Sequence, residues 1–213
     1  MSLFLTGTDT GVGKTYTAAA LLRVLRAKGV NCVGYKPICC GDRDDAELLL
    51  AASSGGVTID EINPVWLKTP AAPYPAALVE NVEIDIAMLV TQLRDLQARF
   101  DFVLVEGVGG WLVPIARDYF VSDLAAAMQL PVAVVALNRL GALNHTMLTV
   151  RAVEAAHLDC RAVILNAPGA HHDYATVTNQ EILAAISSVP ILPGLAADTA
   201  ELVPEWQAFI AGL

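Results

Sequence analysis

A glycine-rich turn near the start of the chain, between an apolar segment and a helical segment, constrains the fold more than any other feature. Residues 3–6 predict a buried strand, and residues 14–28 predict a helix that Gly29 ends. Between them, Gly11 and Gly13 allow backbone N–H groups to turn inward around an anion at the positive end of the helix. This order of strand, turn and helix predicts a phosphate-binding loop.

The residues that follow the glycines support nucleotide binding. Lys14 is expected to reach the β- and γ-phosphates, and the Thr15 hydroxyl is expected to contact Mg²⁺. The spacing departs from the standard pattern G-x-x-x-x-G-K-[ST], because Thr8 stands five residues before Gly13 and Gly7 comes one residue too early. A purely structural glycine turn is the alternative. The predicted nucleotide-binding residues of the loop are Gly11, Val12, Gly13, Lys14, Thr15 and Tyr16.

Short apolar runs alternate with longer helical segments along the rest of the chain. The expected strands are 31–36, 102–106, 132–137, 161–166 and 191–193, and the expected helices are 44–53, 84–99, 123–128, 144–156, 176–186 and 204–210. Residues 57–77 hold four prolines and are expected to be mostly loop. Strands that are apolar throughout predict a mostly parallel sheet with helices on both faces. We therefore expect an α/β fold of the P-loop NTPase type, with residues 1–213 forming a single domain.

Two carboxylates are expected at the carboxyl edge of this sheet. Glu106 ends an apolar strand, where a carboxylate is costly unless it is paired or bound to a metal ion. Asp45 follows the second strand and its loop, although Asp42 and Asp44 compete for its role and a helix N-terminal charge is the alternative. Because Mg²⁺ prefers oxygen ligands, Thr15, Asp45 and Glu106 are the predicted metal ligands. The turn after the strand, which lets a phosphate or substrate approach closely, contains Gly107, Val108 and Gly109.

Lys36 ends the second expected strand, in the run Gly34-Tyr35-Lys36-Pro37. The proline stops the strand at this point and begins a turn. A lysine at this edge would place a second positive charge near a transferring phosphoryl group. A solvated lysine at a strand end is the alternative.

Composition argues against several classes of function. Thirteen Lys and Arg against twenty-two Asp and Glu give a formal charge of -9, which argues against non-specific nucleic-acid binding. Apolar runs such as 130–137 are far shorter than the roughly 20 residues that span a bilayer. No secretory signal is recognised, so we expect a cytoplasmic protein with neither membrane nor nucleic-acid partners. The cysteines lack zinc spacing and are expected to be reduced thiols; they are Cys32, Cys39, Cys40 and Cys160.

Several motifs together resemble the dethiobiotin synthetase family. They are Gly7-Thr8-Asp9-Thr10 with Val12-Gly13-Lys14-Thr15, Gly34-Tyr35-Lys36-Pro37, Val105-Glu106-Gly107-Val108-Gly109-Gly110-Trp111, Leu140-Gly141, Asn144-His145 and Met147-Leu148-Thr149. The similarity runs in order over nearly the whole chain and accounts for the displaced first glycine. It implies a cyclo-ligase of biotin biosynthesis that uses ATP and Mg²⁺. In that family, 7,8-diaminononanoate and CO₂ form a carbamate, ATP phosphorylates it, and ring closure releases dethiobiotin, ADP and phosphate.

The resemblance also implies roles for individual residues. Lys14, Lys36 and Thr10 would carry catalysis, with Thr10 near the diamine or the carbamate. Asn166 would contact adenine, although a turn residue is the alternative when the resemblance is set aside. The loop beside the base contains Pro193, Gly194 and Leu195.

The resemblance also implies a homodimer in which the substrate carboxylate lies on a helix N-terminus of the second subunit. The residues at this N-terminus are Gly141, Ala142, Leu143 and Asn144. Tyr174 would reach the same carboxylate, with a packing role as the alternative. His145 is not expected to be catalytic. Cys40 is a predicted substrate contact that stands where members of the family often have Ser or Thr, and Gly11 stands where they often have Glu.

The main alternative function is a non-enzymatic ATP switch of the same superfamily. Such proteins need a basic patch for DNA or a basic amphipathic tail for membranes, and residues 201–213 contain no Lys or Arg. A nucleotide-sensing regulatory module is a second alternative. An amidotransferase-type ligase would need a glutaminase domain, for which 213 residues leave no room, and the cysteine positions disfavour an iron–sulfur ATPase.

Overall fold

A parallel sheet forms the centre of the computed structural model, which describes residues 1–167, 173–196, 199 and 201–212. Within these residues the sheet has six strands in the order β10-β9-β8-β1-β5-β2. The strands are β1 (Ser2–Gly7), β2 (Cys32–Tyr35), β5 (Phe102–Glu106), β8 (Val132–Leu137), β9 (Cys160–Asn166) and β10 (Ile191–Pro193). The expected α/β fold with a mostly parallel sheet is confirmed.

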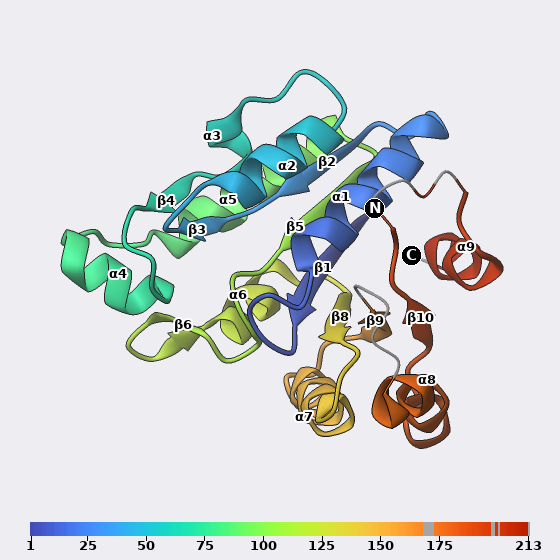
Figure 1. Cartoon of the computed structure of the whole chain (residues 1–213). Coiled ribbons are helices and arrows are strands. Elements are labelled where there is room, and N and C mark those ends of the chain that lie inside the picture. The colour runs from blue at the N-terminus through green and yellow to red at the C-terminus, as the bar shows by residue number, and fades with distance from the viewer. Residues whose placement is uncertain (168–172, 197–198, 200, 213) are drawn as a thin grey trace.

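The central strands are apolar along their whole length because both faces of the sheet are covered. Leu3, Phe4 and Leu5 of β1 are at most 1% exposed, although their side chains alternate between the two faces. Figure 1 shows α1 in front of the sheet and α5 behind it. The helices are α1 (Lys14–Ala27), α2 (Asp44–Ala52), α3 (Ile59–Ile62), α4 (Pro73–Glu80), α5 (Ile86–Arg99), α6 (Val121–Met128), α7 (Ala142–Ala155), α8 (Tyr174–Ile186) and α9 (Pro204–Ala211).

The segment 57–77 corrects our expectation of a loop, because more than half of it lies in regular elements. Thr58 caps α3 with a capping box that includes Glu61. The chain then forms β4 (Val65–Leu67), which pairs in parallel with β3 (Ile38–Cys40) outside the main sheet. Two prolines open α4, at positions where a helix needs no N–H donor.

A second small sheet was also not expected from the sequence. Its antiparallel strands are β6 (Pro114–Ala116) and β7 (Tyr119–Phe120), just before α6. The seven helices that the sequence predicts are all present, and each begins and ends within two residues of its expected bounds. No helix in the described part of the chain has both the length and the apolar character needed to cross a bilayer.

Candidate active site

Strand register brings three chain segments to one edge of the sheet. Leu5 of β1 is paired with Glu106 of β5, and Tyr35 of β2 is paired with Val105 of β5. Lys36 follows Tyr35, so Lys36 and Glu106 leave neighbouring parallel strands side by side. The loop between β1 and α1 leaves the same edge, which is where open parallel sheets bind their ligands.

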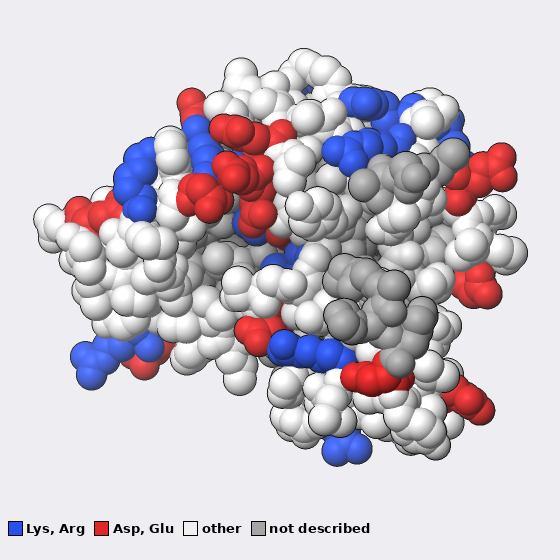
Figure 2. Space-filling view, in the orientation of Figure 1, with Lys and Arg blue, Asp and Glu red and all other residues white. Residues whose placement is uncertain are grey.

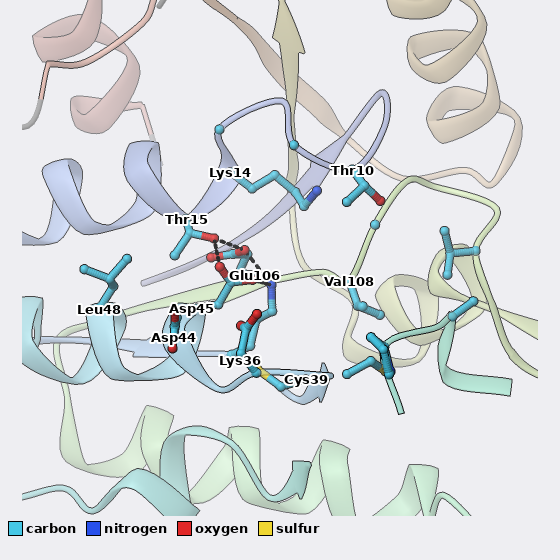
Figure 3. Close-up of a pocket in the computed structure, with 18 of the residues that line it drawn as sticks. Thr10, Lys14, Thr15, Lys36, Cys39, Asp44, Asp45, Leu48, Glu106 and Val108 are labelled. Atoms are coloured by element: carbon cyan, nitrogen blue, oxygen red, sulfur yellow. Dashed lines mark hydrogen bonds and ion pairs between the residues drawn. The ribbon is translucent and has the colours of Figure 1, made fainter. Parts of the chain in front are cut away.

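The glycine-rich loop has the backbone conformation that an anion cradle requires. Gly11 and Gly13 have φ angles of +72° and +90°, in the left-handed region that glycine adopts without strain. α1 begins at the next residue, Lys14, whose side chain is 6% exposed and donates to the carbonyl oxygen of Asp9 over 3.1 Å. The ammonium group therefore folds back over the hollow of the loop, as Figure 3 shows.

Three oxygen-bearing side chains meet beside this loop. The Thr15 hydroxyl oxygen lies 2.8 Å from Asp45 Oδ1 and 2.8 Å from Glu106 Oε1. One hydroxyl proton can be donated to only one of these carboxylates at a time. Asp45 lies in the first turn of α2, whereas Asp42 and Asp44 line the cavity without a hydrogen bond to Thr15 in the described structure.

Lys36 lies directly against both carboxylates. Its Nζ is 2.7 Å from Asp45 Oδ2, 2.6 Å from Glu106 Oε1 and 3.4 Å from the carbonyl oxygen of Gly107. The Lys36 and Glu106 side chains are 3% and 0% exposed. Figure 3 shows Lys14 and Lys36 approaching the same space from opposite sides, with Thr15, Asp45 and Glu106 beside it. Lys36 is therefore a buried residue and not a solvated lysine at a strand end.

Burial and charge shift the acid–base properties of these groups. Burial lowers the pKa of Lys14 to about 8, and the nearby Lys36 ammonium contributes to this shift. Burial also tends to lower the pKa of Lys36, but Glu106 and Asp45 outweigh it and hold that pKa above its usual value. Burial tends to raise the pKa of Asp45, yet Lys36 holds it below its usual range. Lys36 is therefore a permanent cation at neutral pH.

These side chains line a cavity of about 700 Å³. Of the predicted residues, those that line it are Thr10, Gly11, Gly13, Lys14, Thr15, Tyr16, Lys36, Cys40, Asp45, Glu106, Val108 and Gly109. Pro70, Ala71 and Ala72 also line the cavity and were not predicted, because a proline-rich segment carries no sequence signal for a site. Figure 2 shows acidic side chains gathered around a hollow on this face, with Lys or Arg atoms visible inside it.

A second cavity of about 730 Å³ lies on the other side of the glycine-rich loop. Its lining includes Asn166, Pro193, Gly194 and Leu195, which the family resemblance implies lie near a nucleobase. It also includes Val12 of the phosphate loop and shares Gly11, Gly13 and Tyr16 with the first cavity. Asn138 and Gln180 also line it and were not predicted. Its lining is mostly apolar, which suits a flat base.

Apart from Gly107, which directly follows β5, the remaining predicted residues lie at the N-termini of α7 and α8. Gly141, Leu143, Asn144 and Tyr174 line a third cavity of about 590 Å³, apart from the other two. Ala142 is the first residue of α7 and is 3% exposed. Leu140 and Tyr174 are 81% and 87% exposed. Within the described part of one chain, these residues do not join the cavity that holds Lys36.

A buried side-chain amide that was not predicted from the sequence holds the backbone at Lys36 in place. Asn63 is 1% exposed and donates to the carbonyl oxygens of Lys36, over 2.8 Å, and Val65, over 2.9 Å. Its own amide oxygen accepts a bond from Arg43 Nε at 2.9 Å. Arg43 is the residue before α2, so this amide connects the backbone of Lys36 to the helix that carries Asp45. A lone Asn after a short segment carries no sequence signal for this role.

The cysteines near the site are not reactive thiolates. Burial raises the pKa of Cys39 to about 12 and that of Cys40 to about 11. Both are free thiols, as are Cys32 and Cys160. At neutral pH, Cys40 therefore offers the cavity a weak S–H donor rather than a nucleophile.

The residues present fit a magnesium ion. Glu106 Oε2 is buried and has no hydrogen-bond partner in the described structure, which is costly unless a cation or ligand reaches it. Thr15, Asp45 and Glu106 supply hard oxygen atoms on one side of the cavity, as Mg²⁺ requires. Among the described residues no three His, Cys, Asp or Glu side chains gather as a metal site. An ion here would therefore depend on the Thr15 hydroxyl and on phosphate oxygens as well.

The arrangement can bind and polarise a polyphosphate. Two lysines and a loop of inward N–H groups favour negative charge, while the carboxylates hold Lys36 in place. Phosphoryl transfer needs this combination of positioning and positive charge, and little covalent participation by the protein.

Two solved structures share the fold of this chain at low sequence identity. MinD from Pyrococcus horikoshii OT3, complexed with Mg-ADP, has a TM-score of 0.58 and 17% identity, covering 91% of this chain and 82% of that one. A ParA family ATPase from Chlorobium tepidum TLS has a TM-score of 0.56 and 12% identity, covering 99% of this chain and 89% of that one. These likenesses support the P-loop NTPase fold.

Sequence comparisons identify the family. A family model described as an AAA domain matches residues 1–199. The ATP-dependent dethiobiotin synthetase BioD of Akkermansia muciniphila is 43% identical over 191 residues, 90% of each chain. The protein of the same name from Anaeromyxobacter dehalogenans strain 2CP-C is 44% identical over 189 residues, 87% of this chain and 85% of that one. The chain therefore belongs to the family of ATP-dependent dethiobiotin synthetases, ligases that form C–N bonds.

Proposed function

We propose that this protein closes the ureido ring of dethiobiotin from 7,8-diaminononanoate, CO₂ and ATP, with release of ADP and phosphate. The observation that carries the proposal is the convergence of Lys14, Lys36 and three oxygen-bearing side chains on one cavity. A carbamate and a γ-phosphate are both anions, so their reaction requires cations on several sides. Family membership supplies the substrate class.

Each charged residue has a separate task in this proposal. Lys14 holds the β- and γ-phosphates through the loop, while Lys36 neutralises the carbamate oxygens as they approach the γ-phosphorus. Thr10, on the loop, donates a hydrogen bond to the carbamate or the diamine. The phosphorylated carbamate is a mixed anhydride, and the second amine displaces phosphate from it to close the ring.

Mg²⁺ at Thr15, Asp45 and Glu106 would neutralise phosphate charge and orient the triphosphate. The support for this assignment is the donor set and the unpartnered Glu106 Oε2. Lys36 would keep its contact with Glu106 in this arrangement, and the N–H groups now directed at Asp45 and at the Gly107 carbonyl would turn to the substrate.

The second cavity accommodates the adenine, with Asn166 and the segment 193–195 around it. The substrate carboxylate lies at the N-terminus of α7 in a second copy of the chain, because in one chain the cavity with Gly141 and Asn144 is separate from the cavity with Lys36. Backbone N–H groups at a helix N-terminus suit a carboxylate. A homodimer is therefore part of the proposal, and light scattering of the purified protein tests it.

ATP hydrolysis measured with each substrate omitted in turn tests the proposed function. The expected result is phosphate release only when both the diamine and bicarbonate are present, together with a dethiobiotin product that carries the label of ¹³C-bicarbonate. Lys28→Ala serves as a control, because this exposed lysine lies at the far end of α1. Equal ATP hydrolysis with and without the diamine would favour a nucleotide switch instead.

A further inference from the structure

Asn166, the last residue of β9, contacts the phosphate loop as well as the second cavity. Its amide nitrogen lies 2.9 Å from the carbonyl oxygen of Val12 and 3.3 Å from that of Gly13. The same nitrogen lies 3.1 Å from Thr17 Oγ1, in the first turn of α1. These partners are 149 to 154 residues away in the sequence. The side chain thus connects the end of β9 to the phosphate loop and to the first turn of α1.

Hydrogen-bond chemistry fixes the orientation of this amide. The carbonyl oxygens of Val12 and Gly13 can only accept hydrogen bonds, so the group that faces them must be the NH₂. The amide oxygen then faces away from the loop carbonyls.

Two glycines enclose the same amide. A Cβ atom on Gly13 would lie 2.6 Å from the amide nitrogen, and a Cβ atom on Gly194 would lie 2.5 Å from the amide oxygen. The backbone is held too, because Asn138 N donates to the carbonyl oxygen of Asn166 over 2.7 Å. The position of the amide is therefore fixed from several sides, and the missing side chains of the glycines make room for it.

We infer that Asn166 is a positioning residue that orients the N–H groups of the phosphate loop, an inference that rests on the proposed nucleotide site. A trans peptide directs its C=O and N–H to opposite sides. The Val12 carbonyl shares a peptide with the N–H of Gly13, and the Gly13 carbonyl shares one with the N–H of Lys14. Asn166 holds the Val12 carbonyl toward β9, and it shares the Gly13 carbonyl with the N–H of Thr17, which donates to that oxygen over 3.0 Å. With the carbonyls held in this way, the N–H groups of Gly13 and Lys14 are directed to the opposite side, where a phosphate can accept them.

Binding of ATP and of inorganic tripolyphosphate, each with Mg²⁺, tests this role. Tripolyphosphate has no base, so its affinity does not respond to a residue that contacts only adenine. Isothermal titration calorimetry of Asn166→Ala should show both ligands weakened by a similar factor, about tenfold or more for the loss of the tether. Asn31→Ala, an exposed asparagine bonded to the carbonyl oxygen of Arg99, is the matched control and should bind both ligands as the wild type does.

Loss of ATP affinity with unchanged tripolyphosphate affinity would overturn the inference and leave Asn166 as a base contact only. Wild-type protein that binds neither ligand would contradict the proposed function instead. Thermal melting without ligand establishes that each variant is folded. If Asn166→Ala does not fold, Asn166→Ser replaces it, and amide hydrogen exchange gives an independent readout in the ligand-free protein. Faster exchange at Gly13 and Lys14 supports the tether, and unchanged exchange at both amides overturns it.

Discussion

Lys36 Nζ lies 2.6 Å from Glu106 Oε1, and the two side chains are 3% and 0% exposed. A buried lysine without an anionic partner loses its charge, because desolvation favours the neutral amine. Here the carboxylates of Glu106 and Asp45 raise the pKa of Lys36 above its usual value. The pair therefore keeps a buried positive charge at the wall of the cavity, where such a charge can act on a phosphoryl group.

Replacement of Lys36 should separate catalysis from nucleotide binding. Lys36→Ala is expected to lower kcat by about a hundredfold or more, because a charge directed at the transition state is lost. The dissociation constant of the Lys36→Ala protein for ATP should change little, because Lys14 and the loop hold the phosphates. Steady-state kinetics and calorimetry measure the two effects, with Lys28→Ala as the control. Wild-type turnover in a folded Lys36→Ala protein would remove Lys36 from the catalytic group.

The Thr15 hydroxyl should control the magnesium requirement. Thr15→Ala is expected to raise the Mg²⁺ concentration for half-maximal activity by about tenfold or more, because one of the three proposed oxygen ligands is lost. Thr15→Ser keeps the hydroxyl and should stay close to the wild type. Activity measured across a Mg²⁺ titration compares the three proteins. Identical titrations for the Ala and Ser variants would argue against a ligand role for Thr15.

The buried amide of Asn63 should matter for both stability and turnover. Asn63→Ala leaves the carbonyl oxygens of Lys36 and Val65 without their donor, at an expected cost of about 1–3 kcal/mol in unfolding free energy. Because the Lys36 backbone loses this support, kcat should fall as well. Urea denaturation and kinetics measure the two effects, and Asn31→Ala, at an exposed asparagine, is the control. A stable Asn63→Ala protein with wild-type kcat would contradict the bracing role.

A pH-dependent contribution to stability is expected at Glu61. The Arg99 guanidinium and the backbone N–H and hydroxyl of Thr58 lower the pKa of Glu61 from 4.5 to about 2. A lowered folded-state pKa means that the stabilisation is complete above about pH 4.5 and is lost as pH falls toward 2. Solvent screening at this partly exposed pair limits it to about 0.5–1 kcal/mol.

Thermal melting of Glu61→Gln against the wild type between pH 7 and pH 2.5 tests this expectation. The difference in Tm, about 1–4 °C at pH 7, should shrink as the solution becomes more acidic. Glu83→Gln, at an exposed glutamate, should show no such trend. A Tm difference that stays constant across this range would rule out the carboxylate as its source.

Close packing around Asn166 predicts a penalty for a single methyl group. Gly194→Ala places a Cβ atom 2.5 Å from the Asn166 amide oxygen and 3.1 Å from its Cα, so the amide must move. ATP affinity should fall by about tenfold, as expected for losing a hydrogen-bonded contact. Gly55→Ala meets nothing within 4 Å and serves as the control. Equal ATP affinity in both variants would show that this contact tolerates movement.

Short stretches of sequence predicted the strands, helices and turns that form from residues close together in the chain. β1 and β5 are continuous apolar runs, and the glycines at 11 and 13 stand directly before α1. The expectation of a loop over 57–77 is wrong because proline can begin a helix as well as break one: Pro73 and Pro75 occupy the first turn of α4. The pairing of β3 with β4 joins residues about 27 positions apart, which no short window contains.

The sequence pattern alone could not predict which side chains meet in the site. Sequence left Asp42, Asp44 and Asp45 as competing candidates, because their order along the chain does not say which side of α2 faces Thr15. In the structure, Asp45 is the one bonded to Thr15 and Lys36. The bonds from Asn63 and Asn166 to distant backbone carbonyls depend on tertiary packing and have no local signature.

The strand order has a consequence for how the protein assembles on the ribosome. β1, β5 and β2 are adjacent in the sheet, and all three lie within the first 106 residues, together with Lys14, Lys36, Asp45 and Glu106. Asn166 and Gly194 emerge only with β9, β10 and the turn after it. A nascent chain therefore contains every charged residue that lines the first cavity before Asn166 has been translated. The site is completed only when the later strands β9 and β10 have been added.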